Sequence, residues 1–180
     1  ASFRVHKRLQ DCLILFKKIL TNIPNAKYFI LGKLDNQTNK LVKRIISYYN
    51  LSDHVVFLGH VPVQSLPNYY SRADLMIYPS WIDNCPNTVV ECLSSGTPVV
   101  CPDSGGVKEL VGSGGIVVPE NKFPKVDFTD YYCVSKIPRI NYSLYLKAVL
   151  EIKKNLRLYS ENARKVAERD LDIKKISNQY

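Results

Sequence analysis

The stretch "DNCPNTVVECLSSGTPVV", residues 83–100, contains two carboxylates, a helix start and an apolar run in immediate succession. A helix beginning near Pro86 is favoured, because proline is tolerated in the first turn, where the amides have no intrahelical partners. The helix is expected over 87–95, and "TPVVC", residues 97–101, is expected to be a buried strand. A helix that leads directly into an apolar strand is typical of an α/β fold.

The same alternation runs through most of the chain. Short apolar runs predict further strands at 27–32, 54–59, 73–80 and 114–119. Helices or helical turns are expected at 7–21, 41–49, 65–72 and 107–111, and again from residue 142 onward. Because the strands are continuous apolar runs, they predict a parallel sheet covered on both faces. We therefore predict an α/β fold, a Rossmann-like doubly wound parallel sheet with C-terminal helices, in a single domain over residues 1–180.

Two segments stand outside this alternation. Residues 121–140 mix prolines, charges and aromatics without a period, and we interpret them as a long loop or insertion. Loops of such length are uncommon in compact domains and are often functional. The first residues, "ASFRV", predict a strand that begins at the first position without a preceding turn. We therefore expect the chain to be part of a longer protein.

The chain is basic, with 25 lysines and arginines against 16 acidic residues and a formal charge of +9. This charge favours anionic partners such as phosphorylated small molecules or an acidic lipid surface, although a solvated lysine-rich face is an alternative. No basic run with interleaved aromatics indicates a nucleic-acid partner. No apolar run approaches the roughly 18–20 residues that cross a bilayer, and no signal peptide is apparent. We expect a cytoplasmic protein, with peripheral contact to an anionic membrane as one option.

The cysteines and histidines indicate neither a disulfide framework nor a metal site. The five cysteines are odd in number and lack a C-x2-C spacing, and the three histidines are scattered. Cys12 and Cys92 fall on apolar helix faces, so we expect buried thiols in a reducing compartment.

Several polar residues follow the predicted strands. In doubly wound sheets, ligands bind at the carboxyl ends of the strands. Lys7, Gly59, residues 80–87 and residues 103–106 all occupy such positions, so we expect them at one edge of the sheet.

The start of the 87–95 helix is a candidate phosphate site. The N–H groups of Asn87 and Thr88 would point out of the helix end, where the helix dipole favours an anion. Glu91, one turn later, could accept hydrogen bonds from sugar hydroxyls, and Asp83 would meet the ligand from the other side. The arrangement suits a diphosphate with hydroxyl-rich rings at both ends. The alternative is that Asp83 or Asn84 caps the helix and Glu91 is a surface residue.

Five motifs within residues 54–120 extend this interpretation. "VFLGHV", "YYSRADLMIYPS", "PNTVVE", "SGTPVV" and "GGVKELV" occur in an order and spacing that resemble the GT-B glycosyltransferases of the large retaining group called family 4, or group 1. The resemblance is to the C-terminal half of that fold, which binds the nucleotide-sugar donor. It implies transfer of a sugar from a nucleotide-diphosphate sugar to an acceptor, with retention of configuration. It also implies that no metal or other cofactor is needed, that the acceptor-binding N-terminal domain is missing, and that the isolated domain is inactive.

The resemblance assigns roles to single residues. Glu91 matches a glutamate that holds the donor ribose, and Asp83 matches a glutamate near the bond that breaks, which makes Asp83 the catalytic candidate. Lys7 matches the lysine of a basic pair that neutralises the diphosphate. The arginine of that pair falls on Ser2, and Arg4, two residues on and on the same strand face, could substitute.

The glycines and two neighbouring residues are assigned in the same way. The loop from Gly59 to Val61 would receive the nucleotide base, and Gly105 and Gly106 would lie beside the sugar and phosphates, although tight turns explain these glycines equally well. Trp81 either stacks on a ring or packs in the interior. Arg8, where the family prefers glycine, is expected to be solvated at the start of the first helix.

Two other functions remain open at this stage. In a non-catalytic nucleotide-sugar-binding or interaction module, Asp83 and Ser2 would reflect lost catalysis. A sugar-nucleotide epimerase would need its own acid–base residues, and no convincing set is apparent.

Overall fold

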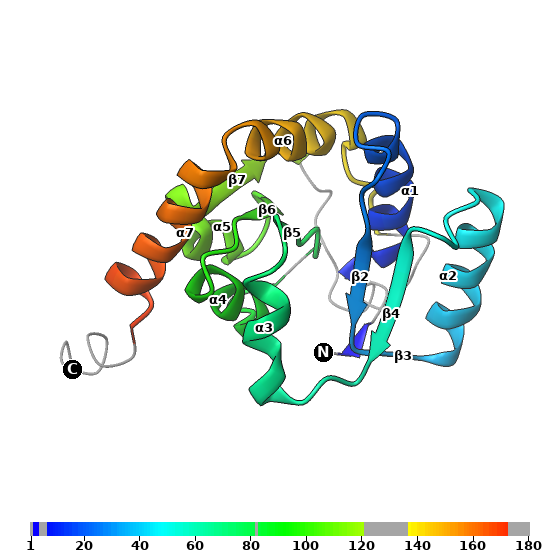
Figure 1. The fold of residues 1–180 in the computed structure, drawn as a ribbon, viewed down its shortest axis with the longest axis horizontal. Helices are drawn as coiled ribbons and strands as arrows, with labels where there is room; N and C mark the ends of the chain where they lie inside the picture. The colour runs from blue at the N-terminus through cyan, green and yellow to red at the C-terminus, as the bar shows by residue number, and fades with distance from the viewer. Residues whose placement is uncertain (1, 4–6, 82, 121–136, 173–180) are drawn as a thin grey trace.

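The computed structural model describes residues 2–3, 7–81, 83–120 and 137–172, in which strands and helices alternate (Figure 1). The elements are β1 Ser2–Phe3, α1 Leu9–Leu20, β2 Tyr28–Leu31, β3 Lys33–Leu34, α2 Asn36–Tyr48, β4 Val55–Gly59, η2 Val63–Ser65, α3 Leu66–Tyr70, β5 Met76–Ile77, α4 Asn87–Ser94, β6 Val99–Pro102, α5 Val107–Val111, η3 Gly112–Gly114, β7 Gly115–Val118, α6 Tyr142–Lys154 and α7 Leu156–Asp170.

Every strand pairing in the described residues is parallel. β1 pairs with β3, β2 pairs with β4, and β6 lies between β5 and β7. The predicted α/β fold with parallel strands is therefore confirmed. Hydrogen bonding divides the described strands into three groups, and β3, which is two residues long, was not predicted.

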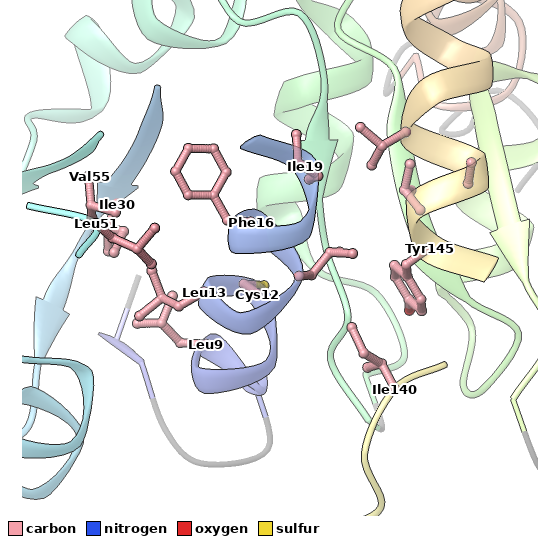
Figure 2. Packing of buried hydrophobic residues seen from close by; sticks show 14 of the residues in the cluster. Leu9, Cys12, Leu13, Phe16, Ile19, Ile30, Leu51, Val55, Ile140 and Tyr145 are labelled. Atoms are coloured by element: carbon pink, nitrogen blue, oxygen red, sulfur yellow. The ribbon is translucent and has the colours of Figure 1, made fainter. Parts of the chain in front are cut away.

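The first hydrophobic core surrounds α1. Leu9 and Leu13 lie toward Ile30 of β2 and Val55 of β4, whereas Tyr145 approaches α1 from α6 (Figure 2). Helix α1 is thus covered by the β2–β4 pair on one flank and by α6 on another, which explains why most of its apolar residues are buried.

The second hydrophobic core lies between α4, β6, α5 and α7. Its buried members are Tyr78, Val89, Cys92, Leu93, Val99, Cys101, Val107, Val111, Ala163, Val166 and Ala167. The buried residues of α6 and α7 therefore belong to different cores, although Leu156 and Tyr159 at the start of α7 still pack against the first core. The helices predicted from residue 142 onward are confirmed as α6 and α7.

The long loop predicted over 121–140 falls largely on 121–136, which lie outside the described residues. The last part, residues 137–141, leads into α6 without helix or strand, and Ile137 and Ile140 are buried.

Three cysteines are buried, as predicted for Cys12 and Cys92. Burial raises the pKa of the Cys12, Cys92 and Cys101 thiols to about 12 in each case. These thiols stay protonated near neutral pH and are poor nucleophiles. Cys85 is exposed, and Cys133 lies outside the described residues.

Helix α2 begins at Asn36, five residues before the predicted start at residue 41. Asp35 caps it, because its side chain accepts hydrogen bonds from the Thr38 amide at 2.9 Å and from the Thr38 hydroxyl at 2.7 Å. These bonds lower the pKa of Asp35 below its ordinary value.

Replacing Asp35 by alanine should lower the free energy of unfolding by about 1 kcal/mol at pH 7, the usual cost of losing a helix cap. The pKa of Asp35 is lower in the folded protein than in the unfolded chain. The stabilisation is therefore fully present above the unfolded-state pKa, and it is lost as the pH falls through the folded-state pKa. Urea unfolding of the wild type and Asp35→Ala at pH 7 and near pH 3 tests this, and the difference should shrink at the lower pH. Asp53→Ala, which removes another exposed carboxylate, is the control, with an expected change within about 0.5 kcal/mol. An Asp35 effect of equal size at both pH values would contradict the prediction.

Candidate functional site

A lysine, a tyrosine and an aspartate from distant parts of the chain meet before α4. The Lys7 ammonium donates to the Tyr78 hydroxyl at 2.7 Å and forms an ion pair with Asp83. The Tyr78 hydroxyl in turn donates to Asp83 Oδ2 at 2.6 Å. Lys7 and Asp83 were predicted to share a site, and the structure brings them into direct contact.

Tyr78 orders this cluster. Burial, the hydrogen bond to Asp83 and the negative charge of Asp83 raise the pKa of Tyr78 far above its ordinary value, so the phenol remains a donor. The Lys7 nitrogen also lies 5.1 Å from the centre of the Tyr78 ring. The side chains of Lys7 and Asp83 are 23% and 21% exposed, so both charges remain accessible to a ligand.

Helix α4 begins beside the cluster. Pro86 precedes its first residue, Asn87, and its first turn has no side-chain cap. The Asn87 and Thr88 amides belong to the first turn, where backbone donors have no intrahelical partners. A side-chain hydrogen bond between Thr88 and Tyr78 lowers the pKa of the tyrosine, against the effect of burial. The first turn of α4 therefore lies next to the cluster. The helix start predicted at Pro86 is confirmed, and its amides suit an anion.

Glu91 lies one turn further along α4 and is half-buried. Its carboxylate accepts a hydrogen bond from the Tyr70 hydroxyl at 3.1 Å. The Tyr70 carbonyl accepts one from the Thr97 hydroxyl at 2.5 Å, so the tyrosine is itself anchored to the turn between α4 and β6. Glu91 is therefore oriented by a partner that the sequence analysis did not identify.

The two glycines after β6 hold the Asp83 loop. The Gly106 amide donates to the Asp83 carbonyl at 3.1 Å. Gly105 has a φ of +72°, and a Cβ added there would lie 2.5 Å from the Asp83 carbonyl oxygen. A Cβ at Gly106 would be closer still to the Asn84 carbonyl oxygen. Glycine is required at both positions by the close approach of two backbones.

Not every predicted site residue joins this cluster. Gly59 ends β4, and its carbonyl accepts from the Gly32 amide at 2.7 Å within the β2–β4 pair. Val61 is half-buried in the loop that follows. Gly59 ends a strand of one group and Val61 follows it, whereas Tyr78 follows β5 of another group, so their link to the Lys7 cluster stays a prediction. Arg4 lies outside the described residues.

The expectation for Arg8 was wrong. Its side chain is 0% exposed and forms an ion pair with Glu120, whose side chain is 5% exposed. Arg8 also adopts a φ of +51° as the residue before α1. Its acidic partner is 112 positions away in the chain, so no local pattern indicated burial. Trp81 is 3% exposed and packs in the interior, the second of its two interpretations.

The structure adds two negative findings. In the ranges that the structure describes, no three histidine, cysteine, aspartate or glutamate side chains gather in a way that could hold a metal ion. In the same ranges, every helix is too short or too polar to traverse a lipid bilayer.

Comparison with known proteins identifies the family of this chain. Residues 1–125 match the family described as "Glycosyl transferases group 1". The chain is 37% identical over 65 residues to O-antigen chain mannosyltransferase B of Escherichia coli, and the aligned segment covers 36% of this chain and 17% of that protein. It is 31% identical over 118 residues to an uncharacterised glycosyltransferase of Methanocaldococcus jannaschii, covering 64% of this chain and 27% of that protein.

Solved structures share the fold. Anabaena HepE in complex with UDP-glucose has a TM-score of 0.76 at 19% identity and covers 99% of this chain and 45% of that one. The pneumococcal O-GlcNAc transferase GtfA, in complex with UDP and GlcNAc, has a TM-score of 0.73 at 17% identity, covering 93% of this chain and 31% of that one. The chain spans less than half the length of each of these relatives. With its parallel α/β fold and a family match over residues 1–125, the chain belongs to the group 1 glycosyl transferases.

Proposed function

We propose that this chain is the donor-binding domain of a glycosyltransferase that moves a sugar from a nucleotide-diphosphate sugar to an acceptor, with retention of configuration. The observation that carries the proposal is the contact of Lys7 with Asp83 beside the uncapped start of α4, in a member of this family. The complexes of HepE with UDP-glucose and of GtfA with UDP and GlcNAc support a nucleotide sugar as the ligand class.

The charges of the proposed site suit the reaction. When the bond between the sugar C1 and the diphosphate oxygen breaks, its electron pair stays on the phosphate, and the sugar ring becomes positive. Lys7 and the first amides of α4 stabilise the negative diphosphate, and Asp83 stabilises or orients the sugar. The acceptor oxygen bonds to C1 on the face that the diphosphate left, and its proton passes to the leaving phosphate oxygen. Glu91 holds the donor through ribose hydroxyls.

A titration of the chain with UDP-, GDP- and ADP-sugars tests donor binding directly. Calorimetry should detect one site, with a clear preference for one of the three bases. The absence of binding by every member of the panel would refute the proposed donor-binding role.

Cys85 gives an independent prediction of where the donor binds, because this exposed thiol lies between Asp83 and Asn87. In a Cys133→Ser background, iodoacetamide should label Cys85 and spare the buried Cys12, Cys92 and Cys101. A saturating donor should slow the labelling of Cys85 at least several-fold, as measured by peptide mass spectrometry. An unchanged rate with bound donor would place the donor elsewhere.

Catalysis is tested in the complete protein, because we propose that the domain alone binds donor but transfers little. Transfer should occur with retention, which NMR of the anomeric proton in the product reports. Asp83→Ala should reduce turnover much more than donor affinity. Transfer that persists unaltered in this variant removes Asp83 from the catalytic set. Donor binding without any transfer in the complete protein would favour a non-catalytic nucleotide-sugar-binding module instead.

We further propose a cytoplasmic location with peripheral contact to anionic lipid. The charge of +9 supports this, as does α2, which carries exposed Lys40, Lys43 and Arg44 beside Tyr48, which is 80% exposed. Sedimentation with vesicles of phosphatidylglycerol and phosphatidylcholine should retain the protein at low salt, and pure phosphatidylcholine should not. Equal retention by both vesicle types would exclude a charge-driven contact.

A further inference from the structure

The buried ion pair of Arg8 and Glu120 lies beside the proposed donor site but is not part of it. The Arg8 guanidinium is 0% exposed, so it cannot reach a ligand as it stands. It follows Lys7 directly in the chain and precedes α1. Its fixed position therefore constrains the backbone from which the Lys7 side chain extends.

Arg8 contacts the carboxyl ends of two strand segments at once. One guanidinium nitrogen pairs with Glu120, just after β7, and also donates to the Pro79 carbonyl, after β5, at 3.3 Å. The second guanidinium nitrogen donates to Glu120 at 3.4 Å. A planar guanidinium with several fixed donors is suited to such a bridge, whereas a lysine is not.

Glu120 extends the bridge to the loop after β6. Its carboxylate accepts from the Ser104 hydroxyl at 3.3 Å, and its amide donates to Asp103 at 3.0 Å. The one Ser104 hydroxyl proton is shared between the Glu120 carboxylate and the Trp81 carbonyl, which lies 2.6 Å from the Ser104 oxygen and two residues before Asp83. The network thus joins the residue after Lys7 to the loop that carries Asp83.

Arg8 adopts a strained backbone conformation at the centre of this network. With a φ of +51°, Arg8 occupies a region that residues with a Cβ adopt rarely. A buried ion pair with several further hydrogen bonds holds it there, and removal of one partner would leave the other charge buried and unpaired.

We infer that Arg8 and Glu120 are positioning residues, which hold Lys7 against Tyr78 and Asp83 and thereby set the affinity of the site for a diphosphate. The nucleotide part of the test rests on the proposed function, whereas the position of Lys7 can be measured without any ligand.

Reductive [13C]methylation of the whole chain reports the position of Lys7 by NMR. The Lys7 nitrogen lies 5.1 Å from the Tyr78 ring centre, so its dimethylammonium signal should be shifted upfield from those of exposed lysines, and Lys7→Arg assigns it. In Arg8→Gly and in Glu120→Gln, which keeps the size of the side chain, the signal should move to the exposed-lysine position. Arg139→Gln, which breaks the 2.9 Å ion pair of Asp11 in α1, is the matched control and should leave the signal in place.

The second readout compares a nucleoside diphosphate with its nucleoside, for example UDP with uridine, using the base preferred in the donor panel. Arg8→Gly and Glu120→Gln should weaken diphosphate binding at least tenfold and change nucleoside binding less than twofold. A Lys7→Met variant should show the same loss, with little further loss when it is combined with Arg8→Gly.

An unmoved Lys7 signal in both folded variants overturns the inference. Diphosphate and nucleoside affinities that fall together also overturn it, because the pair would then be merely structural. A moved signal in a protein that binds no nucleotide would support the positioning of Lys7 and refute only the donor-binding role.

Discussion

Lys7→Met should raise the dissociation constant of the preferred nucleoside diphosphate about 10- to 150-fold. The estimate corresponds to about 1.5–3 kcal/mol, the contribution of a hydrogen bond that involves a charged group. Methionine matches the apolar stem of lysine and removes the ammonium, so the change acts mainly through the charge. Because the Lys7 ammonium already contacts Tyr78 and Asp83, it is held in place before a diphosphate arrives and loses little freedom on binding.

Calorimetry with a nucleoside diphosphate and its nucleoside measures this effect. Nucleoside affinity should be unchanged, because the nucleoside lacks the phosphates that Lys7 is proposed to bind. Lys17→Met is the control, since Lys17 is an exposed lysine of α1 outside the cluster. If Lys7→Met and Lys17→Met weakened diphosphate binding equally, the effect would be due to the net charge of the protein. That result would argue against a direct contact between Lys7 and the diphosphate.

Gly105→Ala should lower the free energy of unfolding by about 2–5 kcal/mol and should also weaken donor binding. Two free-energy costs combine. Alanine disfavours the left-handed backbone by about 1–2 kcal/mol, and the steric overlap of its Cβ with the neighbouring backbone costs about 1–3 kcal/mol. The overlap arises because the new Cβ would lie 2.5 Å from the Asp83 carbonyl oxygen. Relief requires the Asp83 loop to move, and this loop carries the carboxylate that contacts Lys7.

Gly59→Ala separates the two costs. Gly59 has a φ of +63°, close to the +72° of Gly105, but a Cβ there would meet no atom within 4 Å. Chemical denaturation should therefore show a loss of only about 1–2 kcal/mol for Gly59→Ala. If both variants were destabilised equally, the close approach of Gly105 to the Asp83 carbonyl would not contribute to the loss of stability.

The sequence predicts those features that depend on neighbouring residues. Pro86 and the apolar spacing after it locate the start of α4, and the apolar runs predict the parallel strands. The start of α2 was missed because its first turn is polar and gives no apolar period, although Asp35 followed by Thr38 was an available capping signal.

The parts of the site that the sequence did not predict depend on pairs of distant residues. The Arg8 side chain is buried because Glu120 neutralises it from 112 positions away. Tyr70 orients Glu91 across 21 positions, and Tyr78 receives a hydrogen bond from Lys7 across 71. The position of Tyr78 at the end of a predicted strand was an available signal, because strand ends carry ligand sites in this fold class.

The buried residues of the two C-terminal helices fall in separate cores, and this limits where the chain can be cut or recombined. Helix α6 packs against α1, whereas α7 packs against α4 and so closely on Gly114 that an added methyl group would meet the Ala163 backbone at 2.9 Å (Figure 1). A chimera joined at Asn155 would pair an α7 from one parent with an α4 and a Gly114 turn from another. Exchange of segments between relatives should therefore transfer α4, the Gly114 turn and α7 as one unit, so that the second core keeps its native partners.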